Sequence, residues 1–80
     1  MKSRVKVYDE LLKKYGNLQI VVAIEELSEL QKELTKSLRG KANLDNIIEE
    51  LADTQIMIEQ MMCRFNVSKS VINEKIKEKS

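Results

Sequence analysis

The sequence contains no proline, histidine or tryptophan, and it has one cysteine, Cys63, among its 80 residues. Because a disulfide needs two cysteines, no intrachain disulfide can form, and a single reduced thiol favours a cytoplasmic location. Without histidine, zinc sites and the di-iron sites of helical bundles lose one of their usual ligands. The absence of proline leaves two glycines, Gly16 and Gly40, as the main interruptions to helical structure.

Charge of one sign and long apolar runs are also missing. The 14 Lys and Arg side chains nearly balance the 13 Asp and Glu side chains, and the formal net charge is +1. A nucleic-acid-binding surface is expected to be strongly basic, so no nucleic-acid polymer is expected as a partner. The longest apolar run, residues 20–24, falls far short of the ~20 residues of a membrane span, and residues 1–10 have no apolar signal core. We therefore expect neither membrane insertion nor export.

Apolar residues recur at helical spacing through most of the chain, which predicts a single all-α domain over residues 1–80. The expected helices cover residues of about 3–15, 18–38, 44–65 and 69–78. The two glycines fall where helices are expected to end. The expected N-caps are Asn17 for the second helix, Asn43 or Asp45 for the third, and Ser68 for the fourth.

The two long central helices each carry one apolar stripe at helical spacing. Its members are Ile20, Ala23, Ile24, Leu27, Leu30, Leu34 and Leu38 on residues 18–38, and Leu44, Ile47, Ile48, Leu51, Ile58, Met62 and Phe65 on residues 44–65. We predict that these stripes pack together as an antiparallel helical hairpin with short flanking helices.

A chain this short has a marginal core of its own, so we also expect a homodimer or homotetramer with a four-helix-type bundle core. The cluster of Ile56, Met57, Met61 and Met62 is the expected subunit interface, with a nucleotide pocket as the alternative.

Two acidic clusters interrupt the apolar segments: Glu25, Glu26 and Glu29 in one, Glu50 and Asp53 in the other. Residues equidistant from a turn at residues 39–40 lie at the same height in a hairpin, so Glu26 is expected level with Asp53, and Glu29 with Glu50. Such carboxylates would repel one another, and a cation is expected to compensate. An all-oxygen ligand set suits Mg²⁺, with Mn²⁺ as a possible substitute.

The pattern Glu-Glu-x-x-Glu at residues 25–29, followed by Glu-x-x-Asp at residues 50–53, resembles the signature of the MazG-like all-α nucleoside triphosphate pyrophosphohydrolases, relatives of the dimeric dUTPases. The resemblance covers about residues 15–67 and includes the spacer of residues 30–49. It implies an oligomeric helical bundle that hydrolyses a nucleoside triphosphate between the α- and β-phosphates, as in house-cleaning of the nucleotide pool.

The resemblance also implies roles for particular side chains. Mg²⁺ would be held by Glu26, Glu29, Glu50 and Asp53, and Glu26 or Glu25 would orient the attacking water or accept its proton. Lys75 and Lys79 are the best candidates for binding the outer phosphates, and Gln19 is a candidate for hydrogen bonding to the base.

Two other interpretations remain open at this stage. Each glutamate taken singly fits an ordinary solvated helix surface, because glutamate is a good helix former. The alternative function is that of a non-catalytic helical oligomer or a nucleotide-binding regulatory adaptor of the same fold. A plain coiled coil is disfavoured, since the apolar residues do not keep a strict heptad.

Overall fold

The computed structural model describes Arg4, Lys6, Val7, Glu10, Lys13 and residues 16–80. Its regular elements within these residues are the helices α2 (Leu18–Leu38), α3 (Leu44–Arg64) and α4 (Lys69–Lys79), with no strand. The all-α class is therefore confirmed for this part of the chain. The described positions before Gly16 are helical, and the rest of the helix expected over residues 3–15 lies outside the described residues.

The two long helices end in the same way. After α2, Gly40 has a φ of 74°, the amide of Gly40 donates to the carbonyl of Ser37 (3.1 Å), and the amide of Lys41 donates to the carbonyl of Lys36 (3.0 Å). After α3, Asn66 has a φ of 54° and the amide of Val67 donates to the carbonyl of Met62 (2.8 Å). Both are Schellman motifs, in which a left-handed residue satisfies the last helical carbonyls.

The helix starts agree with the predicted caps at two of three places. The Asn43 side chain accepts a hydrogen bond from the amide of Asn46 (3.1 Å), and the Ser68 hydroxyl accepts one from the amide of Val71 (3.3 Å). Asn17 does stand at the N-cap position of α2, but its backbone is helical rather than extended and its side chain caps no amide. Its side-chain oxygen instead accepts a hydrogen bond from the Arg64 guanidinium, at the end of α3.

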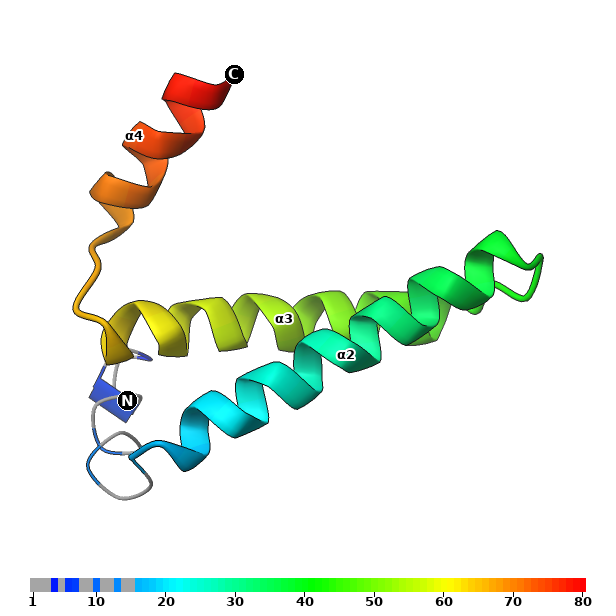
Figure 1. Cartoon of the computed structure of the whole chain (residues 1–80), viewed down its shortest axis with the longest axis horizontal. Helices are drawn as coiled ribbons and strands as arrows, with labels where there is room; N and C mark the ends of the chain where they lie inside the picture. The colour runs from blue at the N-terminus through cyan, green and yellow to red at the C-terminus, as the bar shows by residue number, and fades with distance from the viewer. Residues whose placement is uncertain (1–3, 5, 8–9, 11–12, 14–15) are drawn as a thin grey trace.

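Helices α2 and α3 run side by side in opposite directions (Figure 1). Their least exposed side chains are small or polar more often than apolar: Gln19, Ala23 and Glu33 on α2, and Thr54 and Met57 on α3. Ala23 and Met57 are the only buried apolar residues in the described part of the chain.

The expectation that the apolar stripes pack between the two helices is therefore met only in part in the single chain, because Ala23 is buried but most of the larger stripe residues are exposed. Leu27 and Ile58 are each 50% exposed. They lie about 100° around their helices from Glu26 and Met57, which mark the contact side. The small Ala23 and Thr54 side chains allow the backbones to approach, and this turns the larger apolar residues away from the contact.

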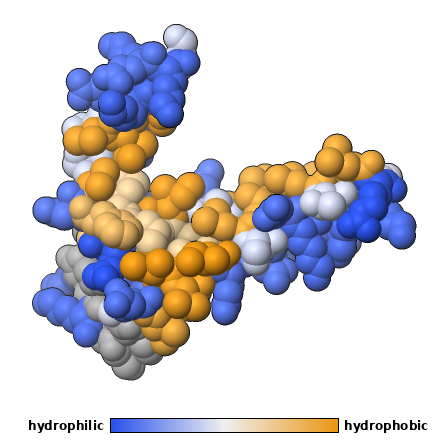
Figure 2. Space-filling view, viewed as in Figure 1, coloured by the Kyte–Doolittle hydropathy of each residue, from blue (hydrophilic) through white to orange (hydrophobic). Residues whose placement is uncertain are grey.

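The two exposed stripes lie on the same face of the α2–α3 pair. Each is displaced from its contact side in the same rotational sense, and because the helices are antiparallel these displacements point to one common face. Figure 2 shows apolar surface along the arm formed by α2 and α3 and in the corner where α4 begins. Helix α4 projects away from this arm (Figure 1). None of the helices in the described residues has the length and apolar character needed to cross a membrane.

Candidate metal centre

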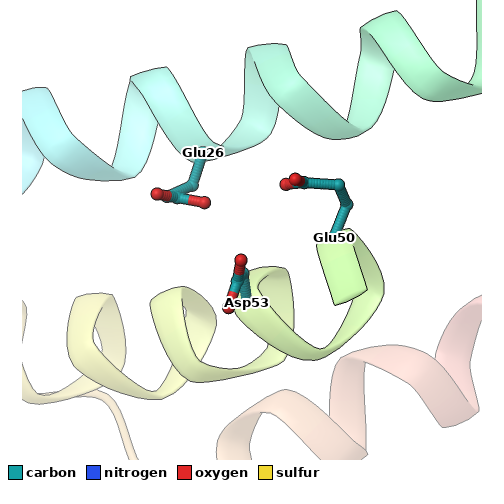
Figure 3. Close-up of side chains that lie close together, drawn as sticks. All are labelled: Glu26, Glu50 and Asp53. Carbon is teal, nitrogen blue, oxygen red and sulfur yellow. The ribbon is translucent and has the colours of Figure 1, made fainter. Parts of the chain in front are cut away.

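Three carboxylates meet between α2 and α3 (Figure 3). Glu26 points from α2 toward α3, whereas Glu50 and Asp53 point from α3 toward α2. One oxygen atom of each side chain lies within 4.8 Å of the oxygens of the other two, and all three residues are half-buried. Residues from two helices, 24 or more positions apart in sequence, thus form one cluster.

Local structure explains why these three side chains converge. Glu50 and Asp53 are three residues apart, so they lie on neighbouring parts of one helix face. Thr54 is buried beside them, and its hydroxyl donates to the carbonyl of Glu50 (2.7 Å), so that this polar group is satisfied within the helix contact. With Ala23 one turn before Glu26 on α2, the helices approach closely enough for the acids to face one another.

The cluster carries negative charge that nothing among the described residues neutralises. None of the three carboxylates pairs there with a lysine or arginine. The Oε2 atom of Glu50 is buried and has no hydrogen-bond partner in the described structure. Burial raises the pKa of Glu50 above its ordinary value, and repulsion from Asp53, Glu26, Glu29 and Glu49 raises that pKa further.

A hard divalent cation fits this arrangement. Carboxylate oxygens are the ligands that Mg²⁺ and Mn²⁺ prefer, and the cation would satisfy the unpaired oxygen of Glu50 while removing the mutual repulsion. In octahedral coordination with Mg–O distances of about 2.1 Å, opposite oxygens lie about 4.2 Å apart and neighbouring ones about 3.0 Å, so separations of up to 4.8 Å would have to shorten when the ion binds.

The other residues expected in the site are placed less centrally. Glu29 is exposed and is not one of the three converging carboxylates, although its charge is close enough to affect the pKa of Glu50. Glu25 is also exposed and outside the cluster. Gln19 is buried two helical turns before Glu26, and neither atom of its amide has a hydrogen-bond partner.

The expected phosphate-binding lysine lies elsewhere in the single chain. The Lys75 ammonium pairs with Glu78 on the same helix (3.1 Å). Both belong to α4, which projects away from the arm that carries the acids (Figure 1). Tyr8 and Tyr15, two of the three aromatic residues, lie outside the described residues, and Phe65 is 62% exposed.

Sequence reasoning placed Ala23 in the helix contact, but it missed the part played there by Thr54 and Glu33. Glu33 is buried, with one oxygen 3.4 Å from the Lys36 ammonium and the other unpaired. A signal existed, because Gln19, Glu26 and Glu33 are spaced by seven residues and so lie on one side of a helix. Because these three residues are polar, the apolar stripe was predicted to form the helix contact instead.

Models of known protein families, curated proteins and solved structures were all compared with the chain, and none of the three comparisons gives a match. The arguments for a function therefore come from the geometry and chemistry of the three-carboxylate cluster and from the sequence pattern around it.

Proposed function

We propose that the chain is a Mg²⁺-dependent nucleoside triphosphate pyrophosphohydrolase, which releases the nucleoside monophosphate and pyrophosphate and so acts in house-cleaning of the nucleotide pool. The observation that carries the proposal is the convergence of Glu26, Glu50 and Asp53 within 4.8 Å, with no cationic partner among the described residues. The resemblance of residues 25–29 and 50–53 to the MazG-like signature supports this reaction over other metal-dependent hydrolyses.

In the proposal, each carboxylate keeps the role that the resemblance implies. Glu26, Glu50 and Asp53, which converge, would hold the cation together with Glu29, which is exposed outside the three-carboxylate cluster. A bound Mg²⁺ or Mn²⁺ supplies positive charge to the phosphate oxygens and lowers the pKa of a coordinated water. Glu26 or Glu25 orients that water or accepts its proton.

Substrate binding needs groups beyond the acids. In the proposal, Gln19 hydrogen-bonds the substrate, because its buried amide has a donor and an acceptor with no other partner in the described structure. Lys75 contacts the outer phosphates. The functional form is a homodimer or homotetramer with a four-helix-type bundle core.

The first test is pyrophosphate release from a panel of ribo- and deoxyribonucleoside triphosphates, with Mg²⁺, with Mn²⁺ and with chelator. We expect metal-dependent release with the monophosphate as co-product. Glu50→Ala and Asp53→Ala should each lower kcat/KM by more than about 100-fold, because each removes a proposed metal ligand.

Glu49→Ala is the matched control, because Glu49 is the exposed neighbour of Glu50 and lies outside the three converging carboxylates. It should keep kcat/KM within about threefold of the wild type, as expected of a surface charge. Wild-type turnover by Asp53→Ala, or an equal loss with Glu49→Ala, would contradict the assignment of the site.

A second candidate function is metal-dependent nucleotide binding without turnover. It is favoured by the placement of Lys75, whose ammonium pairs with Glu78 on a helix that projects away from the acids (Figure 1). Calorimetric titration distinguishes the two candidates. Mg²⁺-dependent nucleotide binding in a sample that forms no monophosphate would favour the binding protein.

A further inference from the structure

A short connection joins α4 to the rest of the chain. Only residues 65–68 separate α3 from α4. The amide of Val67 closes the end of α3, and the Ser68 hydroxyl caps the start of α4 through the amide of Val71 (3.3 Å). The hydrogen bonds of each helix end thus lie on separate sides of the bond between Val67 and Ser68. Rotation of the backbone there would change the direction of α4 without breaking either helix end, as at a hinge.

An open apolar groove lies between α4 and the α2–α3 pair. It has a volume of about 950 Å³, and its lining includes Ile58 and Met62 of α3 and Ile72 and Ile76 of α4. A second hollow of about 290 Å³ shares Ile58, Met62 and Ile72 with the groove and adds Leu27 of α2. Figure 2 shows this apolar surface in the corner where α4 begins. Rotation of α4 toward the pair would bury both walls of the groove, which is favourable.

The apolar side of α4 also carries a lysine. Ile72, Ile76 and Lys79 are spaced by four and three residues, so they lie on one side of the helix. Lys79 is only about 20° around the helix from Ile72, whereas Lys77 is about 140° from it. The Lys79 ammonium has no ion pair or hydrogen bond within the described residues. A closing α4 would therefore direct Lys79 toward the α2–α3 pair and leave Lys77 outside.

Helix lengths place Lys79 at the height of the acids in the closed position. If α4 folds back along α3, residues equally far from the connection lie level. Lys79 is the last residue of α4, and its counterpart on α3 is Thr54, which is next to Asp53. Since α4 is about 17 Å long and α3 about 32 Å, α4 would cover only the half of α3 farther from Gly40. The half nearer Gly40 would stay open for a subunit contact.

The charges of the helices favour this closure. Residues 18–38 and 44–64 carry nine acidic and three basic side chains, so the two long helices have a net charge of −6. Helix α4 carries four lysines and two glutamates, so its net charge is +2. The three-carboxylate cluster has no cationic partner among the described residues. A metal-bound triphosphate at the cluster would add outer phosphates that attract α4 further.

We propose that α4 is a lid, which closes over the groove onto the α2–α3 pair of its own chain when a metal-bound triphosphate occupies the cluster. In the closed form Lys79 joins Lys75 at the outer phosphates, and α4 shields the cluster from water. The phosphate contact stabilises the closed form and so raises its population. The inference rests on the proposed function for the identity of the ligand, but closure needs only bound triphosphate and no turnover.

Double electron–electron resonance on the full chain measures the closure. Spin labels are attached at Ser28→Cys on α2 and Glu74→Cys on α4, both exposed positions, after Cys63→Ser removes the native thiol. Labelled chains are diluted into an excess of unlabelled chains, so that only distances within one chain are detected. We expect inorganic tripolyphosphate with Mg²⁺ to increase the population with a short distance between labels, relative to Mg²⁺ alone. Bound tripolyphosphate with an unchanged distance distribution would overturn the lid.

Lys79→Gln tests the phosphate contact. It should raise the calorimetric Kd for tripolyphosphate with Mg²⁺ by about tenfold or more, because a charge-assisted hydrogen bond is lost, and it should reduce the shift in label distance. Lys77→Gln is the matched control, because it removes the same charge from the outer side of the same helix. Its Kd should stay within about threefold of the wild type. An equal loss in both variants would contradict the role of Lys79.

A second pair of variants tests the apolar contact. Ile76→Ser, within the groove lining, should lower the population with a short label distance both with and without tripolyphosphate. Val71→Ser is the control, since Val71 is exposed on the same helix and outside the groove lining. It should leave that population unchanged. Circular dichroism checks that each variant keeps its helices.

Hydrogen exchange of the unmodified wild type keeps the test valid if a variant fails to fold. Helix α4 is 11 residues long, and isolated helices of this length are marginal in water, so its amides should exchange rapidly in the open form. Tripolyphosphate with Mg²⁺ should slow this exchange by at least about tenfold. Unchanged exchange in α4, or no binding of tripolyphosphate, would overturn the proposal.

The two proposals can fail separately. Closure of α4 without pyrophosphate release from any nucleoside triphosphate would leave the lid in place and contradict the proposed reaction. Pyrophosphate release without closure would support the reaction and overturn the lid.

Discussion

At the scale of single residues, Glu50 is a carboxyl group whose pKa is raised by burial and by neighbouring acids. Its Oε2 atom is buried without a hydrogen-bond partner, and Asp53 and Glu26 direct further negative charge toward it. A glutamate that served only to favour helix formation could stand at an exposed position of the same helix. The repulsion is relieved by a proton or by a cation, and these two outcomes predict different behaviour.

The proton outcome gives a pH dependence of stability in the absence of metal. In the folded state the pKa of Glu50 is raised above its ordinary value of 4.5, which applies to the unfolded chain. Between the unfolded-state pKa and the folded-state pKa, the folded protein therefore binds more protons than the unfolded chain. The free energy of unfolding should therefore fall as the pH rises through that window. Urea denaturation in chelator, measured from pH 4.5 to neutral pH, checks this.

Glu50→Gln should be more stable than the wild type at neutral pH and should lose this part of the pH dependence. Glu74→Gln removes the same charge from exposed α4 and should follow the wild-type profile. Saturating Mg²⁺ should reduce the difference between Glu50→Gln and the wild type at neutral pH, because the cation binds only the folded wild-type site. Identical profiles for all three proteins would show that burial and neighbouring charges do not raise the pKa of Glu50 in the folded state.

At the scale of helices, the ends are specified by local hydrogen bonds. Asn43 caps α3 through the amide of Asn46, and Gly40 and Asn66 close α2 and α3 with left-handed backbones. Asn17 makes a different hydrogen bond from the one expected of an N-cap side chain. It stands at the start of α2, yet its side chain accepts from Arg64 and so joins the start of α2 to the end of α3.

The two asparagines make a direct comparison. Asn43→Ala should lower the free energy of unfolding by about 1 kcal/mol, because the amide of Asn46 loses its partner. Asn17→Ala removes an exposed side-chain hydrogen bond and no cap, so a loss below about 0.5 kcal/mol is expected. Urea denaturation followed by circular dichroism measures both. A larger loss at Asn17 than at Asn43 would contradict the capping assignment.

At the scale of the whole molecule, the distribution of apolar side chains governs stability. The described residues bury few apolar groups between α2 and α3, and they expose apolar stripes on one common face of the pair. If the chain forms the proposed homo-oligomer, most of its apolar burial would come from association. Folding and association should therefore be linked.

Thermal unfolding should depend on protein concentration. If two copies unfold together, each tenfold increase in concentration should raise the Tm by about 3–5 °C, because mass action favours the dimer. Differential scanning calorimetry over a hundredfold range of concentration measures this. A Tm that stays constant over that range would mean that the chain folds and unfolds as a monomer.

Much of the fold was predictable from local sequence. The bounds of α2 agree with the prediction, and those of α3 and α4 differ by one residue, because glycine, asparagine and serine act on helix ends over a few residues. The convergence of Glu26 with Asp53 followed from their equal distance from the turn. Glu29, placed by the same reasoning, instead lies at the exposed edge, since a small rotation of a helix moves a side chain out of a cluster.

The sequence by itself determined that the chain is helical in the described part, where its helices begin and end, and that acids recur in both long helices. Only the tertiary structure decided which side of each helix meets the other. Apolar periodicity predicts that one stripe of a helix packs against other apolar groups, but it does not identify the element that provides them. Close approach at Ala23 and Thr54 placed the acids at the contact and left the larger apolar residues exposed, because backbone distance depends on side-chain size on both helices at once.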